Sequence, residues 1–189
     1  MSTRLYFAYG SNLHPTRLME RIPSARLVAR ARLDGHVLRY HKRGACGSGK
    51  CNAFYTGDSR DHVLGAAYRL SQHEKHRLDT FEGEGYLCRD ITIEMDGGRD
   101  IAFAYIAVGH FIDNALQPYA WYHALVTAGA RYLAFPESYI ANYLDVNTQA
   151  DPDRERRARH MELLARMERA MKNATHGVDV SLARNPARR

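Results

Sequence analysis

The sequence of 189 residues lacks any long apolar stretch and has few cysteines, six prolines and a single tryptophan. It contains no run of about 18 apolar residues, the length needed to cross a membrane. Its start, MSTRLYFAYGSN, lacks the apolar core of a secretory signal. We therefore expect neither a membrane span nor export, and a cytoplasmic location. Cys46, Cys51 and Cys88 are an odd number of cysteines in a chain too long to need disulfides for stability, so we expect reduced thiols.

The composition is that of an ordinary globular protein, with 45% hydrophobic, 25% charged and 10% aromatic residues. A domain of about 150 residues already buries roughly 68–70% of its unfolded surface, whereas two domains would be cramped in this length. We expect one domain over residues 1–150 and a helical tail over residues 151–189 that is no independent domain.

Positive charge is concentrated in that tail, which holds 10 of the 27 Lys and Arg residues and 6 of the 21 Asp and Glu residues. A basic tail could indicate nucleic-acid binding. However, Glu155, Glu162 and Glu168 interrupt the positive residues, a pattern typical of a solvated helix face. We expect no nucleic acid as partner.

Short apolar or alternating segments separated by turn residues predict a mostly antiparallel sheet through the middle of the chain. Asp96-Gly97-Gly98-Arg99 is expected to join the last two strands. The predicted strands are Leu5 to Tyr9, Ala25 to Leu33, Gly35 to Tyr40, Ala53 to Tyr55, Val63 to Leu70, Arg89 to Met95 and Ile101 to Val108.

Helices are predicted where capping signals or an apolar stripe occur. Pro15 opens one at its first helical position, and Ser71 with Glu74 forms a capping box that leads toward Phe81. Two more are expected over Trp121 to Tyr132 and Glu137 to Leu144. A last helix, from about Arg154 to Ala174, carries an apolar stripe that we expect to dock on the body: Met161, Leu164, Met167, Met171 and Ala174.

Two motifs suggest chemistry that their context does not support. The segment from Gly44 to Cys51 nearly matches a phosphate-binding loop, but Cys51 replaces the hydroxyl that would bind Mg²⁺, and a strand is expected to follow. We interpret the segment as a glycine-rich hairpin loop in which Lys50 reaches a substrate carboxylate. His73 and His76 lack the spacing of a zinc motif, and no metal ligand set is expected.

A turn and a helix end form the most informative pair of segments. Tyr9-Gly10-Ser11-Asn12 lies between a strand and a helix, where backbone N–H groups are free to bind an anion or a polarised carbonyl. The second segment, from Leu78 to Tyr86, ends a helix and places carboxylates on a glycine-rich turn. Each segment alone is more often structural than functional.

Together and in this order, the segments resemble the γ-glutamylcyclotransferase family over roughly residues 4 to 145. The resemblance implies an α+β fold with a small mixed β-barrel, flanking helices and a C-terminal helix. The matching motifs are Tyr6-Phe7-Ala8-Tyr9-Gly10-Ser11-Asn12-Leu13, Ile22-Pro23-Ser24-Ala25, Ala31-Arg32-Leu33, Gly65-Ala66-Ala67-Tyr68, Leu78-Asp79 with Glu82-Gly83, Gly129-Ala130 and Pro136.

The resemblance implies that Glu82 is the catalytic acid/base and that the turn Tyr9-Gly10-Ser11-Asn12 binds the γ-glutamyl group. Glu84 and Asp79 are flanking carboxylates. A tyrosine seven residues before the Gly129-Ala130 pair is implied to contact substrate, which gives Tyr122, with Tyr119 as the near alternative. The full set expected to bind substrate is Tyr6, Phe7, Ala8, Tyr9, Gly10, Ser11, Asn12, Lys50, Tyr86 and Tyr122.

The family reaction, which belongs to glutathione metabolism, needs no metal or cofactor, because a γ-glutamyl substrate carries its own nucleophile. Its α-amino group attacks the γ-carbonyl, closes 5-oxoproline and expels an amine or amino acid. A glutamate would act as base only if partial burial raised its pKa, so we expect Glu82 in an apolar cleft.

Two alternatives stay open, namely a pathway enzyme that removes a γ-glutamyl group from a larger amine, and a binding module that uses the basic tail. The leaving group is open as well, and we expect a monomer or homodimer.

Overall fold

The computed structural model describes the backbone of residues 2–182 and the side chains of residues 2–173. Its strands are β1 (Thr3–Ala8), β2 (Arg26–Asp34), β3 (His36–Arg43), β4 (Gly49–Tyr55), β5 (His62–Ser71), β6 (Tyr86–Met95) and β7 (Gly98–Ala107). Its helices are α1 (Pro15–Arg21), α2 (Gln72–Glu82), η1 (Gly109–Phe111), α3 (Ala120–Tyr132), α4 (Glu137–Tyr139), η2 (Ile140–Leu144) and α5 (Arg154–Leu182).

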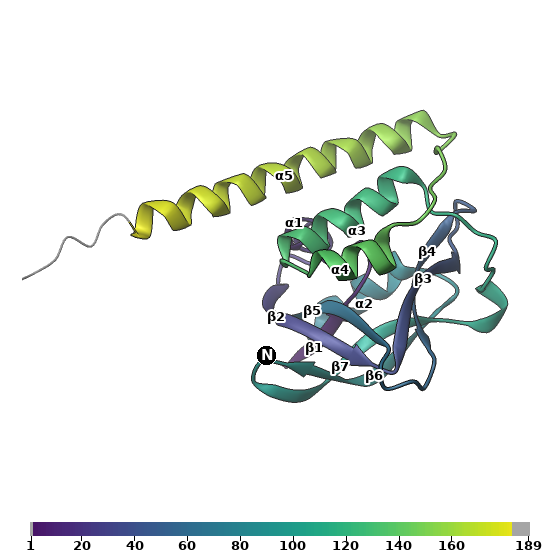
Figure 1. Ribbon diagram of the computed structural model, residues 1–189, viewed down its shortest axis with the longest axis horizontal. Coiled ribbons are helices and arrows are strands. Elements are labelled where there is room, and N and C mark those ends of the chain that lie inside the picture. The colour runs from purple at the N-terminus through teal and green to yellow at the C-terminus, as the bar shows by residue number, and fades with distance from the viewer. Residues whose placement is uncertain (1, 183–189) are drawn as a thin grey trace, which may run out of the picture.

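Five strands close into a barrel in the order β1, β5, β2, β6, β7 (Figure 1). Four of the pairings are antiparallel, and the closing pair, β1 with β7, is parallel with Tyr6 opposite Phe103. Strands β3 and β4 form a separate antiparallel hairpin. In Figure 1 the helices α3, α4 and α5 form a layer over the barrel. This architecture confirms the predicted α+β fold with a small mixed barrel and flanking helices.

Local sequence signals explain several of these elements. In the β6–β7 hairpin Met95 pairs with Gly98, so Asp96-Gly97 is a two-residue turn of the expected kind. Pro15 is the first residue of α1. Ser71 caps α2 by accepting a hydrogen bond from the Glu74 N–H.

The end of α2 places the last residue of that helix, Glu82, at a tyrosine-lined cavity. Gly83 follows with a φ of 64°, a conformation that side chains disfavour, and its N–H bonds to the Asp79 carbonyl oxygen. The chain therefore leaves the helix abruptly, and Glu82 stays at its tip.

The predicted helix from Glu137 to Leu144 is only partly an α-helix. The single turn of α4 passes into η2, a π-helical turn in which the Asp145 N–H bonds to the Ile140 carbonyl oxygen. Such a widening depends on how the turn packs, and propensity does not encode it.

Helix α5 packs against α3 and α1 (Figure 1) and ends at Leu182, beyond the predicted end. Leu164 and Met167 of the predicted stripe are buried. Met161 is 54% exposed, however, and the neighbouring Leu163 is buried in its place. The Ala174 side chain and the residues after 182 lie outside the described part.

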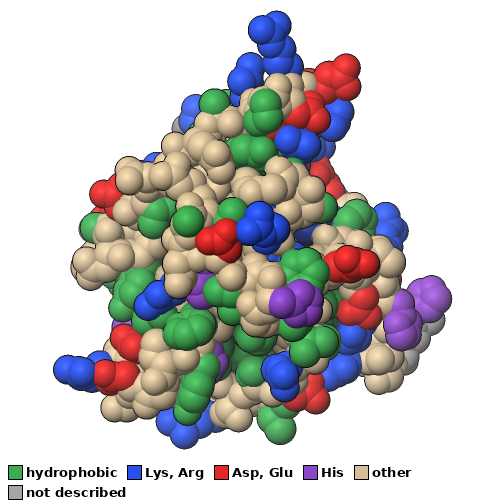
Figure 2. Space-filling model, turned by 90° about the vertical axis from the view of Figure 1, so that its right-hand side faces the viewer, with side chains coloured by type: hydrophobic (Ala, Val, Ile, Leu, Met, Phe, Trp, Pro, Cys, Tyr) green, Lys and Arg blue, Asp and Glu red, His purple; other side chains and the backbone are tan. Residues whose placement is uncertain are grey.

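Charged side chains of both signs are mixed on the face drawn in Figure 2, including the end where α5 begins. Within the described residues, no helix is long and apolar enough to span a membrane.

Candidate active site

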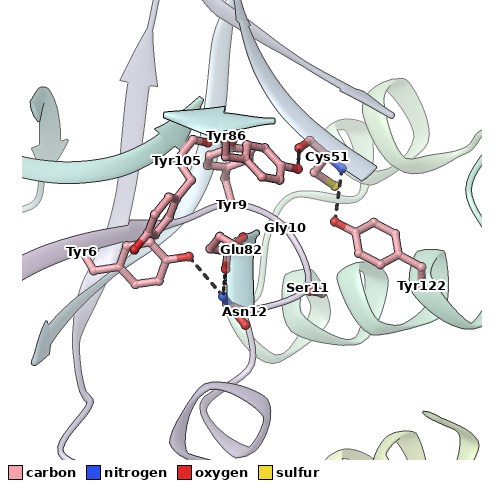
Figure 3. Close-up of a pocket in the computed structure, with 10 residues that line it drawn as sticks. All are labelled: Tyr6, Tyr9, Gly10, Ser11, Asn12, Cys51, Glu82, Tyr86, Tyr105 and Tyr122. Atoms are coloured by element: carbon pink, nitrogen blue, oxygen red, sulfur yellow. Dashed lines mark hydrogen bonds between the residues drawn. The ribbon is translucent and has the colours of Figure 1, made fainter. Parts of the chain in front are cut away.

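A cavity of about 310 Å³ lies where the end of β1, the tip of α2 and helix α3 meet (Figure 3). Most of its wall is aromatic or polar, with one carboxylate. The lining residues are Tyr6, Tyr9, Gly10, Ser11, Asn12, Cys51, Glu82, Tyr86, Tyr105 and Tyr122.

The turn after β1 forms one side of this cavity. The Leu13 N–H closes the turn on the Gly10 carbonyl oxygen at 3.0 Å. The N–H groups of Gly10 and Ser11 have no acceptor among the described residues. A Cβ atom at Gly10 would lie 3.1 Å from the Cys51 Cβ, so glycine lets the backbone pass close to β4. The turn can thus present unpaired N–H groups to a ligand.

The carboxylate of Glu82 faces the turn and is held by one amide. Asn12 Nδ2 donates to Glu82 Oε1 at 2.8 Å, and Arg21 Nη1 lies 3.8 Å from the same oxygen. Arg21 also donates to Asn12 Oδ1 at 3.0 Å, which fixes the orientation of the amide. The second oxygen, Oε2, has no protein partner among the described residues and is not sealed from the cavity. One oxygen is therefore positioned while the other stays available.

Burial raises the pKa of Glu82 above that of an ordinary glutamate. The charge of Arg21 and the Asn12 hydrogen bond oppose that shift without cancelling it. A carboxylate with a raised pKa binds a proton more readily at neutral pH and is a better general base.

Three tyrosines in the wall direct their hydroxyl protons away from the cavity. The hydroxyls of Tyr9 and Tyr86 donate to the backbone carbonyls of Tyr105 and Cys51, respectively. The Tyr105 hydroxyl donates to Asp79 Oδ1 at 2.6 Å. The protein therefore satisfies all three hydroxyl protons, and Asp79 serves as the acceptor for Tyr105.

Tyr6 and Tyr122 differ, because their hydroxyls accept hydrogen bonds. Tyr6 accepts from Asn12 Nδ2 at 3.2 Å, and Tyr122 accepts from the Cys51 N–H at 3.1 Å (Figure 3). The Tyr6 proton has no acceptor among the described residues. Tyr6 can therefore donate to a bound ligand beside Glu82.

The structure brings most of the predicted site residues together at this cavity, with three exceptions. Phe7 and Ala8 do not line the cavity. Phe7 points to the opposite face of its strand from Tyr6. Phe7 and Ala8 are both fully buried in the core. Lys50 lies outside the cavity, in a neighbouring groove. Of the two tyrosine alternatives, Tyr122 lines the cavity, whereas Tyr119 donates to the Cys46 carbonyl oxygen.

Sequence reasoning missed Tyr105, Cys51 and Arg21. No local motif marks them, because Tyr105 comes from β7, Cys51 from the β3–β4 hairpin and Arg21 from α1, which only the tertiary fold brings together. The three cysteines are unpaired. Within the described part of the chain, no cluster of three or more His, Cys, Asp or Glu side chains could hold a metal ion.

Fold and site define an α+β barrel protein with a carboxylate-centred, tyrosine-lined pocket. The family model described as "Gamma-glutamyl cyclotransferase, AIG2-like" matches residues 6–124, and the chain belongs to this family. The family predicted from the motifs is thereby confirmed.

Named relatives agree with this assignment. The chain is 26% identical to the gamma-glutamylcyclotransferase of Bos taurus over 145 residues, which cover 71% of this chain and 74% of the relative. The Homo sapiens gamma-glutamylcyclotransferase matches with the same identity and coverage. A solved structure titled "Gamma-glutamyl cyclotransferase" superposes with a TM-score of 0.73 at 21% identity, covering 91% of this chain and 99% of that chain. At that identity the superposition supports the fold.

Proposed function

We propose that the protein cyclises γ-glutamyl compounds to 5-oxoproline and releases an amine or amino acid, with Glu82 as general acid/base. Family membership and the gamma-glutamylcyclotransferase relatives support the reaction. The observation that carries the mechanism is the Glu82 carboxylate, which is desolvated, held through one oxygen and open to the cavity through the other.

One carboxylate can serve both proton transfers of the reaction. The α-amino group of the substrate, with a reference pKa near 8, attacks the γ-carbonyl only as the neutral amine, so its ammonium form first releases one proton to solvent. As the new N–C bond forms, Glu82 takes a proton from the attacking nitrogen. It then gives that proton to the departing nitrogen as the original amide C–N bond breaks. Such catalysis is typically worth about 10²–10⁴-fold in rate.

The turn after β1 supplies the electrostatic part of the mechanism. The γ-carbonyl oxygen gains negative charge when the ring closes. The unpaired N–H groups of Gly10 and Ser11 are suited to bind it, and the Tyr6 hydroxyl is a further donor on the same wall. A small, rigid cavity also folds the substrate back on itself, and such orientation can contribute roughly 7–11 kcal/mol to an intramolecular attack.

The test is 5-oxoproline release from a panel of γ-glutamyl dipeptides, glutathione and γ-glutamylamines. We expect turnover of at least one class without any added metal or cofactor. Turnover restricted to a bulky γ-glutamylamine would favour the pathway-specific enzyme on the same fold. The absence of 5-oxoproline from every compound would refute the proposed reaction.

A further inference from the structure

The cavity opens into a larger groove of about 1,580 Å³, and the two share Ser11, Glu82, Tyr86 and Tyr122 as lining residues. If the γ-glutamyl group occupies the cavity, as proposed above, the groove is where the leaving part of the substrate lies. The chemistry of the groove wall therefore bears on substrate choice.

The wall of the groove is strongly basic. Five Lys or Arg side chains line it, against two carboxylates, Glu82 and Glu84. The cations are Arg17, Arg21, Lys42, Arg43 and Lys50.

Three of these cations donate to an amide, carboxylate or backbone carbonyl oxygen of the protein. Arg21 donates to Asn12, and Arg43 donates to Asp113 at 2.8 Å. Lys42 is almost completely buried and donates to the Glu84 carbonyl oxygen at 2.7 Å. The charges of Arg21 and Arg43 are compensated by Glu82 and Asp113, and Lys42 is held at the Glu84 carbonyl oxygen.

Arg17 and Lys50 form no ion pair with any carboxylate of the described residues. The Arg17 Nε atom is buried and has no hydrogen-bond partner among the described residues. Lys50 Nζ donates to the Ser48 hydroxyl at 2.8 Å and lies 4.4 Å from the ring centre of Tyr122. Burial lowers the pKa of both side chains, that of Arg17 to about 10. Partly buried cations that lack a carboxylate partner in direct contact cost free energy, which a bound anion would recover.

Helix α5 completes this part of the groove. His160 lines it and stacks on Trp121 with ring centres 3.7 Å apart. Arg17, Lys50 and His160 all line this groove. Asp151 fixes the wall, because it accepts from Trp121 Nε1 at 2.7 Å and pairs with Arg156 of α5.

We propose that Arg17 and Lys50 determine specificity by binding a negatively charged leaving group against the wall that α5 forms. The inference rests on the proposed function. It goes further in assigning two residues and a helix to substrate choice. Helix α5 lies outside residues 6–124, so family membership alone does not imply its part in the site.

The test compares two substrates that differ only in one carboxylate, γ-glutamylalanine and γ-glutamylethylamide. We expect the wild-type protein to have at least a tenfold higher kcat/KM for γ-glutamylalanine, because charge-assisted hydrogen bonds are the strong ones. Lys50→Met and Arg17→Gln should each raise KM for γ-glutamylalanine about tenfold, with kcat and the ethylamide kinetics little changed. Arg60→Gln is the matched control, since Arg60 is exposed and pairs with Asp58.

Calorimetric titration of the same two compounds into the Glu82→Gln protein separates the inference from the proposed function. Tighter binding of γ-glutamylalanine, lost when Arg17 or Lys50 is also replaced, supports the site even if neither compound is turned over. Equal affinities, equal kcat/KM values, or no measurable binding of γ-glutamylalanine would overturn it. Failure of turnover with selective binding would count against the reaction alone.

Discussion

Glu82→Gln removes the proton shuttle while leaving the size and most contacts of the side chain in place. The Asn12 amide can still donate to the new Oε1, and Arg21 still bonds to Asn12. We expect kcat for 5-oxoproline release to fall by about 10²–10⁴-fold, which corresponds to roughly 3–5 kcal/mol of barrier. Substrate affinity should change little. The kcat/KM of the wild type should decrease as the pH is lowered and Glu82 becomes protonated. The apparent pKa of this decrease should lie above about 4.3, the value of an ordinary glutamate.

The same substitution should also alter the pH dependence of stability. Because burial raises the pKa of Glu82, the folded protein binds more protons than the unfolded chain between the unfolded and folded pKa values. The stability of the wild type therefore falls as pH rises through that window, and glutamine removes this loss. We expect Glu82→Gln to have a higher Tm than the wild type at pH 7 and no such advantage below about pH 4. Thermal unfolding at both pH values measures the difference.

Glu84→Gln is the matched control, since Glu84 is an exposed carboxylate two residues along the same turn. It should leave turnover nearly unchanged. An inactive Glu84→Gln protein beside an active Glu82→Gln protein would show that the wrong carboxylate has been assigned. A Glu82→Gln protein that is less stable than the wild type at pH 7 would contradict the electrostatic account.

Three further substitutions test individual contacts. Tyr122→Phe leaves the Cys51 N–H without its acceptor, so denaturant unfolding should show a free energy of unfolding lower by about 1–3 kcal/mol. KM should rise more than kcat falls. Unchanged stability and an unchanged KM would exclude the contact. Gly129→Ala would place a Cβ 2.4 Å from the Leu13 Cβ, and should cost about 1–3 kcal/mol through overpacking; a neutral effect would mean that the turn can shift. Asp151→Asn weakens the ion pair with Arg156 that links α3 to α5. Breaking a buried ion pair costs roughly 3–5 kcal/mol, and we expect the lower end of that range because the Arg156 side chain is 27% exposed. An unchanged Tm would contradict this link.

Much of the fold could be predicted because its signals are local. Pro15, the Ser71 cap and the Asp96-Gly97 turn each act through neighbours a few residues away. The alternation of apolar residues likewise marks strands wherever they pair. The prediction of single residues along α5 was less successful, with Leu163 buried in place of Met161. Which face of a long helix is buried depends on the helix it packs against, so the spacing of apolar residues alone does not decide between nearby positions.

The candidate site was predictable only where a motif marked it. Assigning a whole segment to the substrate included Phe7, which points to the opposite face of the strand from Tyr6, and Ala8, which is fully buried in the core. Tyr105 was missed for the opposite reason. It comes to the cavity because β7 closes the barrel against β1, a pairing between segments almost a hundred residues apart. No window of sequence contains that information.

The amide of Asn12 explains why the turn and the carboxylate act as one unit. Both protons on its Nδ2 are used, one on Glu82 and one on Tyr6, and its Oδ1 accepts from Arg21. A flipped amide would point oxygen at the carboxylate oxygen and nitrogen at the guanidinium, so only the observed orientation satisfies all three partners. An aspartate at this position could donate to neither Glu82 nor Tyr6 and would add a negative charge beside a buried one. The asparagine of the turn therefore positions the carboxylate, while the unpaired backbone N–H groups before it remain free for the substrate.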